Sequence, residues 1–263
     1  MLQPLFLEEI GDDGVARITL TRPAVHNAIN EVLVSELTTV FKGLDSDSRV
    51  RAVVLAAQGK SFCAGADLNW MRTVAGFSED RNVEDAENLA ELMTSLNQLS
   101  KPTVAMVQGP VFGGGVGLVA CCDVAIAAET ARFCLSEVKV GLIPAVISPY
   151  VIASIGERAA RRYFLTAEDF SAWEAHRLGL VQEVVPRDSM EPTCRRILDA
   201  ILLGGPEAQA DAKSLIFSVT GRPISDALRQ ETTARIAKRR TSEEGKEGID
   251  AFLAKRKPSW VMD

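Results

Sequence analysis

The chain has 263 residues, of which 47% are hydrophobic and 24% charged, a balance typical of a globular protein that can bury a sizeable core. A formal net charge of −6 gives no electrostatic reason to bind nucleic acid or an acidic membrane surface. The chain has only two histidines, and they are far apart in the sequence, which argues against a histidine metal site and against a Ser/His/Asp triad. No signal pattern and no run of roughly 18–20 apolar residues is present, so we expect a soluble cytoplasmic protein.

The first half of the sequence predicts strands that alternate with helices. Residues 5–9 and 14–20 alternate in hydrophobicity like the strands of a hairpin, with GDDG as its turn. The elements expected after it are a helix over 31–43 that Asn30 caps, a buried strand over 51–57, a long helix over 79–99, a buried strand over 102–109, a small helix to about 121 and a strand over 123–128. This alternation predicts an α/β fold with a parallel sheet and helices on both faces.

The second half, from about residue 148, is predicted to be mostly helical. The expected elements are helices over 148–166 and 171–179, a single strand over 180–185, and helices over 189–203, 206–218, 223–240 and 243–254. No internal repeat or low-complexity linker is present. We therefore divide the chain into an α/β core over residues 1–200 and a C-terminal helical subdomain over 201–263.

The stretch VFGGGVG contains three consecutive glycines, Gly113 to Gly115, between a predicted strand and a helix. Glycine loses the most backbone freedom on folding, so such a run indicates that something approaches the bare backbone. A dinucleotide-binding fingerprint does not fit, because Leu118 stands where its last glycine is required, and no GK[ST] ends the run as in a P-loop. Two interpretations stay open. The run and the small-residue loop FCAGADL, residues 62–68, leave the same edge of the sheet and either form an oxyanion hole or are close-packed turns without a ligand.

Three segments resemble the successive signatures of the crotonase, or enoyl-CoA hydratase/isomerase, superfamily. They are FCAGADLNWM over 62–71, VQGPVFGGGVGLVACCD over 107–123 and RFCLSEVKVGLIP over 132–144, and the resemblance runs along the whole chain. It implies a crotonase-like spiral of ββα units and an enzyme acting on acyl-CoA thioesters, with no cofactor apart from the coenzyme A of the substrate. By the matching positions, the backbone amides of Ala66 and Gly114 would stabilise a thioester enolate.

General hydratases of this family use two glutamates that flank the double bond. The first would stand at Gly117, where this chain has no carboxylate, and the second matches Glu137. In an apolar pocket the pKa of Glu137 should be raised, so that the group can exchange a proton near neutral pH. One carboxylate can either perform both proton transfers of a hydration or shuttle a proton between two carbons. Hydratase and isomerase chemistry both stay open on these grounds.

A finer resemblance, carried by FCLSEVKVGLIPAVISPYV, FGGGVGLVACCD and GADLNWM, is to the bacterial branch that hydrates 3-methylglutaconyl-CoA or isohexenylglutaconyl-CoA, in leucine or acyclic terpene breakdown. It implies a hydro-lyase for branched, carboxylated 2-enoyl-CoA substrates. We hypothesise that the substrate's own carboxylate, or the hydroxyl of Ser148 or Tyr150, positions the attacking water in place of the glutamate that is missing at Gly117. The alternatives are an enoyl-CoA delta-isomerase that uses Glu137 alone and, against the acidic charge, an RNA-binding role of the kind attributed to one eukaryotic relative.

The resemblance also implies how the substrate is held and how the chain assembles. A homotrimer, often paired into a hexamer, is expected, with the C-terminal helices in the subunit contacts. An aromatic and a lysine near the C-terminus would reach the coenzyme A of a neighbouring subunit, and the 62–68 loop would wrap the adenine and pantetheine. The substrate-binding residues implied are Ala64, Asp67, Leu68, Gly113, Gly117, Phe252 and Lys255.

Overall fold

A six-stranded sheet forms the centre of the fold. Within residues 4–261, which the computed structural model describes, its strands lie in the order β1-β2-β3-β4-β6-β9. Strands β1 and β2 are antiparallel, and each other neighbouring pair in this sheet is parallel. The strands are β1 (Phe6–Ile10), β2 (Val15–Leu20), β3 (Ala52–Ala57), β4 (Thr103–Val107), β6 (Val124–Ala128) and β9 (Glu183–Val185). The predicted hairpin and the predicted parallel sheet are therefore confirmed.

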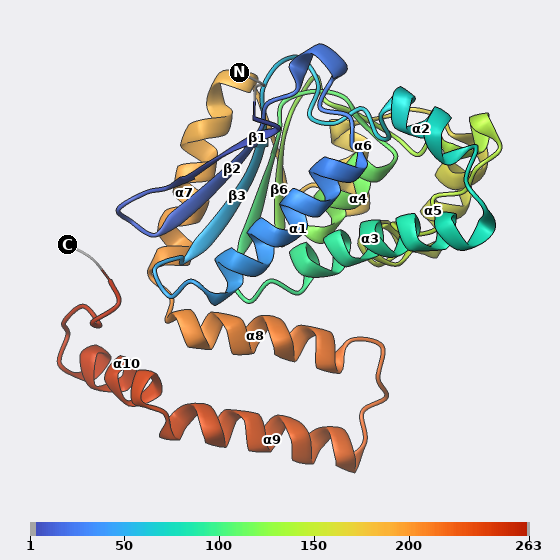
Figure 1. Ribbon diagram of the computed structural model, residues 1–263. Helices are drawn as coiled ribbons and strands as arrows, with labels where there is room; N and C mark the ends of the chain where they lie inside the picture. The colour runs from blue at the N-terminus through green and yellow to red at the C-terminus, as the bar shows by residue number, and fades with distance from the viewer. Residues whose placement is uncertain (1–3, 262–263) are drawn as a thin grey trace.

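Helices cover both faces of this sheet (Figure 1). Successive residues of a strand point to opposite faces, so Val53 and Leu55 join the larger core while Val54 packs against α7 on the other face. Figure 1 shows α1 and α3 on the side opposite to α7. The helices around the sheet are α1 (Glu31–Ser46), α3 (Glu79–Asn97), α4 (Gly114–Cys121), α5 (Ser148–Thr166), α6 (Ala172–Leu178) and α7 (Met190–Leu202).

A second, small sheet positions the glycine run. It consists of β5 (Val111–Phe112), β7 (Arg132–Cys134) and β8 (Phe170–Ser171), with β5 parallel to β7 and β7 antiparallel to β8. Strand β5 ends directly before Gly113, and β7 ends three residues before the short 3-10 helix Glu137–Val140. Because β5 and β7 are neighbours, the glycine run and Glu137 emerge side by side.

Several local features differ from the prediction, including the short strands β5 and β8, for which no strand was predicted. A short helix, α2 (Leu68–Val74), lies in a stretch for which no element was predicted. The helix α5 was predicted as continuous, but Gly156 has a φ of 76° and breaks it into two segments. Only glycine adopts that backbone conformation readily, which explains why the break falls at this residue.

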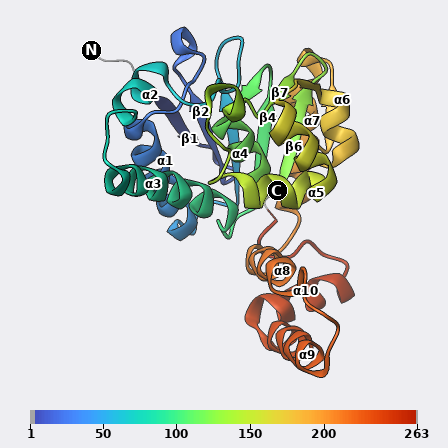
Figure 2. The same cartoon turned by 90° about the vertical axis from the view of Figure 1, so that its right-hand side faces the viewer.

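The C-terminal helices α8 (Pro206–Val219), α9 (Asp226–Thr241) and α10 (Glu243–Leu253) form a separate layer below the core (Figure 2). The Lys213 ammonium on α8 donates to Asp123 of the core at 2.8 Å. Arg51, which is also buried, donates to the carbonyl of Gly204 at 2.7 Å and to that of Trp260 at 3.0 Å. Among the helices that the structure describes, none has the length and apolar composition that a membrane span requires.

Candidate active site

The loop over 62–68 and the glycine run lie in direct contact. The Phe112 amide donates to the Cys63 carbonyl at 2.9 Å, and Cys63 pairs with Val111 in a parallel bridge. Gly65 has a φ of +84°, and a β-carbon added there would lie 3.1 Å from the Phe112 carbonyl oxygen. The two small-residue segments therefore meet as the sequence predicted, and the glycines permit the close approach of one backbone to the other.

The amides of Ala66 and Gly114 lie at this junction without an acceptor. Both neighbours of Ala66 take part in backbone pairing, because Gly65 accepts from Ile29 at 2.7 Å and Asp67 donates to Ile29 at 2.7 Å. Gly114 begins α4, and the first amides of a helix have no partner within it. Within residues 4–261 neither amide donates to another group. Ala66 is exposed and Gly114 is half-buried. Their role as oxyanion-hole donors stays a prediction.

The side chain of Glu137 lies against the glycine run. A β-carbon added at Gly113 would lie 3.0 Å from Glu137 Oε1 and 3.9 Å from the Cα of Gly65. Gly113 also has a φ of +48°, a conformation in which a side chain is strained. Its amide donates to the Cys134 carbonyl at 2.9 Å and is thereby fixed. The carboxyl, the glycine run and the 62–68 loop thus share one corner of the molecule.

The electrostatic surroundings of Glu137 suit proton transfer. Its Oε2 is buried and accepts no hydrogen bond from the described part of the chain. No lysine or arginine within residues 4–261 forms an ion pair with it. Burial raises the pKa of this carboxyl above its ordinary value, as the sequence predicted. A carboxyl with a raised pKa beside backbone amides that lack an acceptor is a candidate general acid or base.

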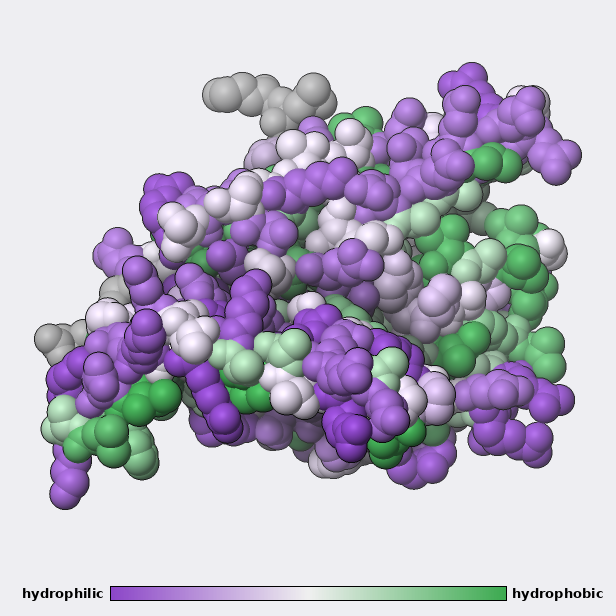
Figure 3. Space-filling model, turned by 90° about the horizontal axis from the view of Figure 1, so that it is seen from below, coloured by the Kyte–Doolittle hydropathy of each residue, from purple (hydrophilic) through white to green (hydrophobic). Residues whose placement is uncertain are grey.

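The segment that follows Glu137 presents an apolar surface. The side chains of Val140, Leu142 and Ile143 are exposed by 60%, 55% and 72%. Figure 3 shows hydrophobic surface gathered at the right-hand end of the molecule, which is the end where α2 and α5 lie in Figure 1. Three apolar side chains therefore lie exposed within six residues of Glu137 along the chain.

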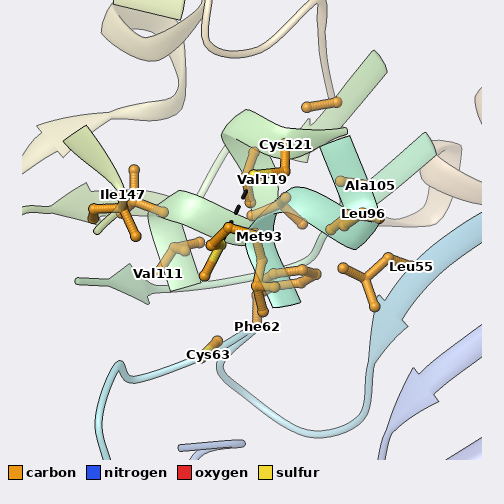
Figure 4. Close-up of a cluster of buried hydrophobic side chains, with 14 of the residues drawn as sticks. Leu55, Phe62, Cys63, Met93, Leu96, Ala105, Val111, Val119, Cys121 and Ile147 are labelled. Carbon is orange, nitrogen blue, oxygen red and sulfur yellow. Dashed lines mark hydrogen bonds between the residues drawn. The ribbon is translucent and has the colours of Figure 1, made fainter. Parts of the chain in front are cut away.

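Gly117 lies inside α4 and is buried. Ile147 and Met93 pack over it. Figure 4 shows both side chains within a cluster of buried hydrophobic residues. The predicted role of Gly117 in substrate binding stays a prediction. This contact could not be predicted, because Ile147 is thirty positions away along the chain and, although it lies in the segment FCLSEVKVGLIPAVISPYV, no role had been expected for it.

Asp67 has structural partners for both carboxylate oxygens. Its Oδ1 accepts from the Asn69 amide at 2.9 Å and caps α2, and its Oδ2 accepts from Arg22 at 2.9 Å. Burial alone would raise its pKa, but the hydrogen bonds from Arg22 and from the Asn69 amide outweigh burial and lower the pKa. Asp67 thus shapes the loop, on which Leu68 is 71% exposed. The amide of Ala64, in the same loop, donates to the His26 carbonyl at 2.9 Å.

The two hydroxyls proposed to place water have partners inside the protein. Ser148 donates to the Ala145 carbonyl at 2.7 Å, which leaves its oxygen available only as an acceptor. The hydroxyls of Tyr150 and Thr94 lie 3.1 Å apart, and either can be the donor. The assignment of either residue to water stays a prediction.

Phe252 and Lys255 lie in the C-terminal layer. Phe252 is 82% exposed, and Lys255 is exposed with a φ of 54°. Figures 1 and 2 both place α10 at the opposite end of the molecule from α2. Within one chain these residues therefore do not join the site, and their predicted reach to a neighbouring subunit stays a prediction.

Comparison with known proteins identifies the family. The sequence model of the enoyl-CoA hydratase/isomerase family matches residues 11–262. The chain belongs to this family. Its structure is similar to that of an enoyl-CoA hydratase from Shewanella pealeana, with 44% identity, a TM-score of 0.95, and coverage of 98% of this chain and 96% of that chain.

Two further relatives agree with this result. Pseudomonas aeruginosa AtuE is 36% identical with a TM-score of 0.94, over 98% of this chain and all of that chain (100%). Enoyl-CoA hydratase ACTT6 of Alternaria alternata is 34% identical over 213 residues, 79% of this chain and 68% of that protein. These matches confirm the α/β crotonase fold and the expectation that this family member is an enzyme, with relatives named as enoyl-CoA hydratases.

Proposed function

We propose that this enzyme hydrates a branched, carboxylated 2-enoyl-CoA of the methylglutaconyl-CoA or isohexenylglutaconyl-CoA type. Family membership supports an enoyl-CoA thioester as the substrate. The observation that carries the mechanism is the carboxyl of Glu137, which lies against Gly113 and whose buried Oε2 accepts no hydrogen bond from residues 4–261. The apolar side chains that follow it support a hydrocarbon branch on the acyl group.

In the proposed reaction Glu137 makes both proton transfers. The thioester oxygen accepts from the amides of Ala66 and Gly114, each typically worth about 2.7–4 kcal/mol when charge develops on that oxygen. Glu137 takes a proton from water while the water oxygen bonds to the β-carbon and the double-bond electrons move to the thioester oxygen. The same carboxyl then returns the proton to the α-carbon, and the enolate collapses to the 3-hydroxyacyl thioester.

The absence of a side chain at Gly117 is the reason for proposing a carboxylated substrate. Water that attacks the β-carbon needs an acceptor in addition to Glu137, and Gly117 offers none. A carboxylate carried by the substrate itself supplies that acceptor. The resemblance of the segments around Ala66, Gly114 and Glu137 to the glutaconyl-CoA branch supports the same choice.

Isomerisation of an enoyl-CoA double bond is the second candidate function. The same observation favours it, since a single carboxyl such as Glu137 can move a proton from one carbon to another without any water. Turnover of a 3-enoyl thioester separates the two, because a hydratase consumes the 2-enoyl thioester and an isomerase interconverts the pair.

The test compares methylglutaconyl-CoA, isohexenylglutaconyl-CoA and crotonyl-CoA with wild type, Glu137→Gln and Glu36→Gln. Glu36 is an exposed glutamate of α1 and serves as the matched control. We expect kcat/KM for a glutaconyl thioester to fall by about 10²–10⁴-fold in Glu137→Gln and to stay unchanged in the control. Near wild-type hydration by Glu137→Gln would refute the single-acid mechanism, and equal rates with crotonyl-CoA would refute the substrate class.

A further inference from the structure

Gly117 has no room for a side chain in this chain. A β-carbon added there would lie 2.3 Å from Cγ2 and 2.9 Å from Cβ of Ile147, and 3.2 Å from Sδ of Met93. Carbon atoms not bonded to each other normally stay about 3.5–4.0 Å apart. Any residue larger than glycine at position 117 therefore requires one of these neighbours to move.

Ile147 is the neighbour that cannot yield by turning its side chain. Its Cβ takes part in the clash, and the position of Cβ is set by the backbone and not by the rotamer. The residue is 2% exposed, stands at the N-cap of α5 and accepts from the Val151 amide at 3.1 Å. Met93 reaches Gly117 only with the sulfur of a flexible side chain, which can move. Ile147 is thus what excludes a side chain at position 117.

Gly113 is the N-cap residue of α4, and the Gly117 amide, one turn further along the helix, donates to the Gly113 carbonyl at 3.4 Å. Glu137 lies against the first of these glycines and Ile147 against the second. A carboxylate at position 117 would therefore stand one helical turn from the glycine that Glu137 approaches. Ile147 occupies the volume through which such a side chain would have to leave the helix.

We infer that Ile147 and Gly117 form a size-matched pair that restricts this site to one protein carboxyl. The inference rests on the proposed function in that Glu137 is taken as the acid and base. It makes Ile147 a determinant of substrate class, although the side chain is buried and does not itself contact substrate. Space for a second carboxyl is removed, so the enzyme depends on an acceptor that arrives with its substrate.

The first test is thermal unfolding of Gly117→Ala, Ile147→Gly and the double variant. Overpacking should lower the Tm of Gly117→Ala by about 5 °C in the wild-type background. In the Ile147→Gly background the same change should not lower the Tm, because the obstacle is gone and alanine favours the helix. An equal loss in both backgrounds would overturn the inference. Ile147→Ala removes only the 2.3 Å contact, so it should give intermediate relief, and it replaces the glycine variant if that one does not fold.

The second test is chemical and compares Gly117→Glu with Gly117→Gln, each combined with Ile147→Gly. The glutamate variant should hydrate crotonyl-CoA about 10-fold faster than its glutamine counterpart, and its pH profile should contain an additional ionisation. Identical profiles, or failure of the glutamate variant to fold where Gly117→Ala with Ile147→Gly folds, would overturn the inference. The unfolding arm uses no substrate, so it separates this inference from a failure of the Glu137 assignment.

Discussion

Gly115→Ala tests whether contact between the two loops holds the site in shape. A β-carbon at position 115 would lie 2.8 Å from the Cβ, 3.0 Å from the carbonyl oxygen and 3.0 Å from the Sγ of Cys63. The carbon contact is about 0.7 Å shorter than an ordinary one, and neither the Cβ nor the carbonyl of Cys63 can leave by a rotamer change. The 62–68 loop, which includes Ala66, must therefore shift by several tenths of an ångström.

The expected cost has two parts of opposite sign. Overpacking of this size costs about 1–3 kcal/mol, and replacing glycine by alanine in a helix returns up to about 1 kcal/mol, which leaves a net loss of about 1 kcal/mol. A shift of this size in a catalytic loop should lower kcat by about 10-fold or more, since misplacement by about 1 Å can cost 10²-fold. Urea unfolding and steady-state kinetics measure the two effects.

Gly43→Ala is the matched control. Gly43 also lies in a helix, α1, but a β-carbon there would have no atom within 4 Å. This change should stabilise the protein by about 1 kcal/mol and leave kcat unchanged. Wild-type kcat in Gly115→Ala, with the control behaving as stated, would refute the reasoning that the contact positions the Ala66 amide.

Three further predictions follow from burial and charge. Burial raises the pKa of Glu137 above its ordinary 4.5, so this group stabilises the fold below pH 4.5 and the stabilisation is lost as the pH rises. The stability of Glu137→Gln relative to wild type should therefore increase between pH 4 and pH 8. A difference in the free energy of urea unfolding that stays constant over this range would contradict this. Asp123→Ala should cost about 3 kcal/mol by removing the acceptor of Lys213, which is 9% exposed, and of the Thr103 amide and hydroxyl, and Lys213→Met should cost less; the reverse order in urea unfolding would contradict this. Replacing Phe252 and Lys255 by alanine should raise KM for acyl-CoA several-fold at unchanged kcat, whereas an unchanged KM would exclude them from coenzyme A binding.

Elements with a long, regular pattern could be predicted from the sequence, and short or interrupted ones could not. The N-cap at Asn30 is observed as predicted, with its side chain accepting from the Leu33 amide at 3.0 Å. Helix α2, Leu68–Val74, has seven residues, too few to establish a helical period. The break at Gly156 could not be predicted, because the apolar spacing continues across it and the positive φ of a glycine leaves no periodic pattern in the sequence.

Some features of the candidate site could likewise be predicted from the sequence, and others could not. Glu137 and its raised pKa could be predicted, because the residue stands in a recognisable segment with apolar neighbours. The packing of Ile147 over Gly117 and the ion pair between Arg22 and Asp67 could not. Each of these two contacts joins residues that are distant along the chain, and none of the four residues is of an unusual type for its position. Such contacts depend on the tertiary arrangement of loops, which spacing along one sequence does not determine.

A structure of the enzyme with a bound acyl-CoA tests the central claim most directly. The account predicts a thioester oxygen about 2.7–3.1 Å from the amide nitrogens of both Ala66 and Gly114, with the Glu137 carboxyl over the α- and β-carbons. A thioester oxygen that contacts neither amide, or a Glu137 side chain turned away from the acyl group, would contradict it.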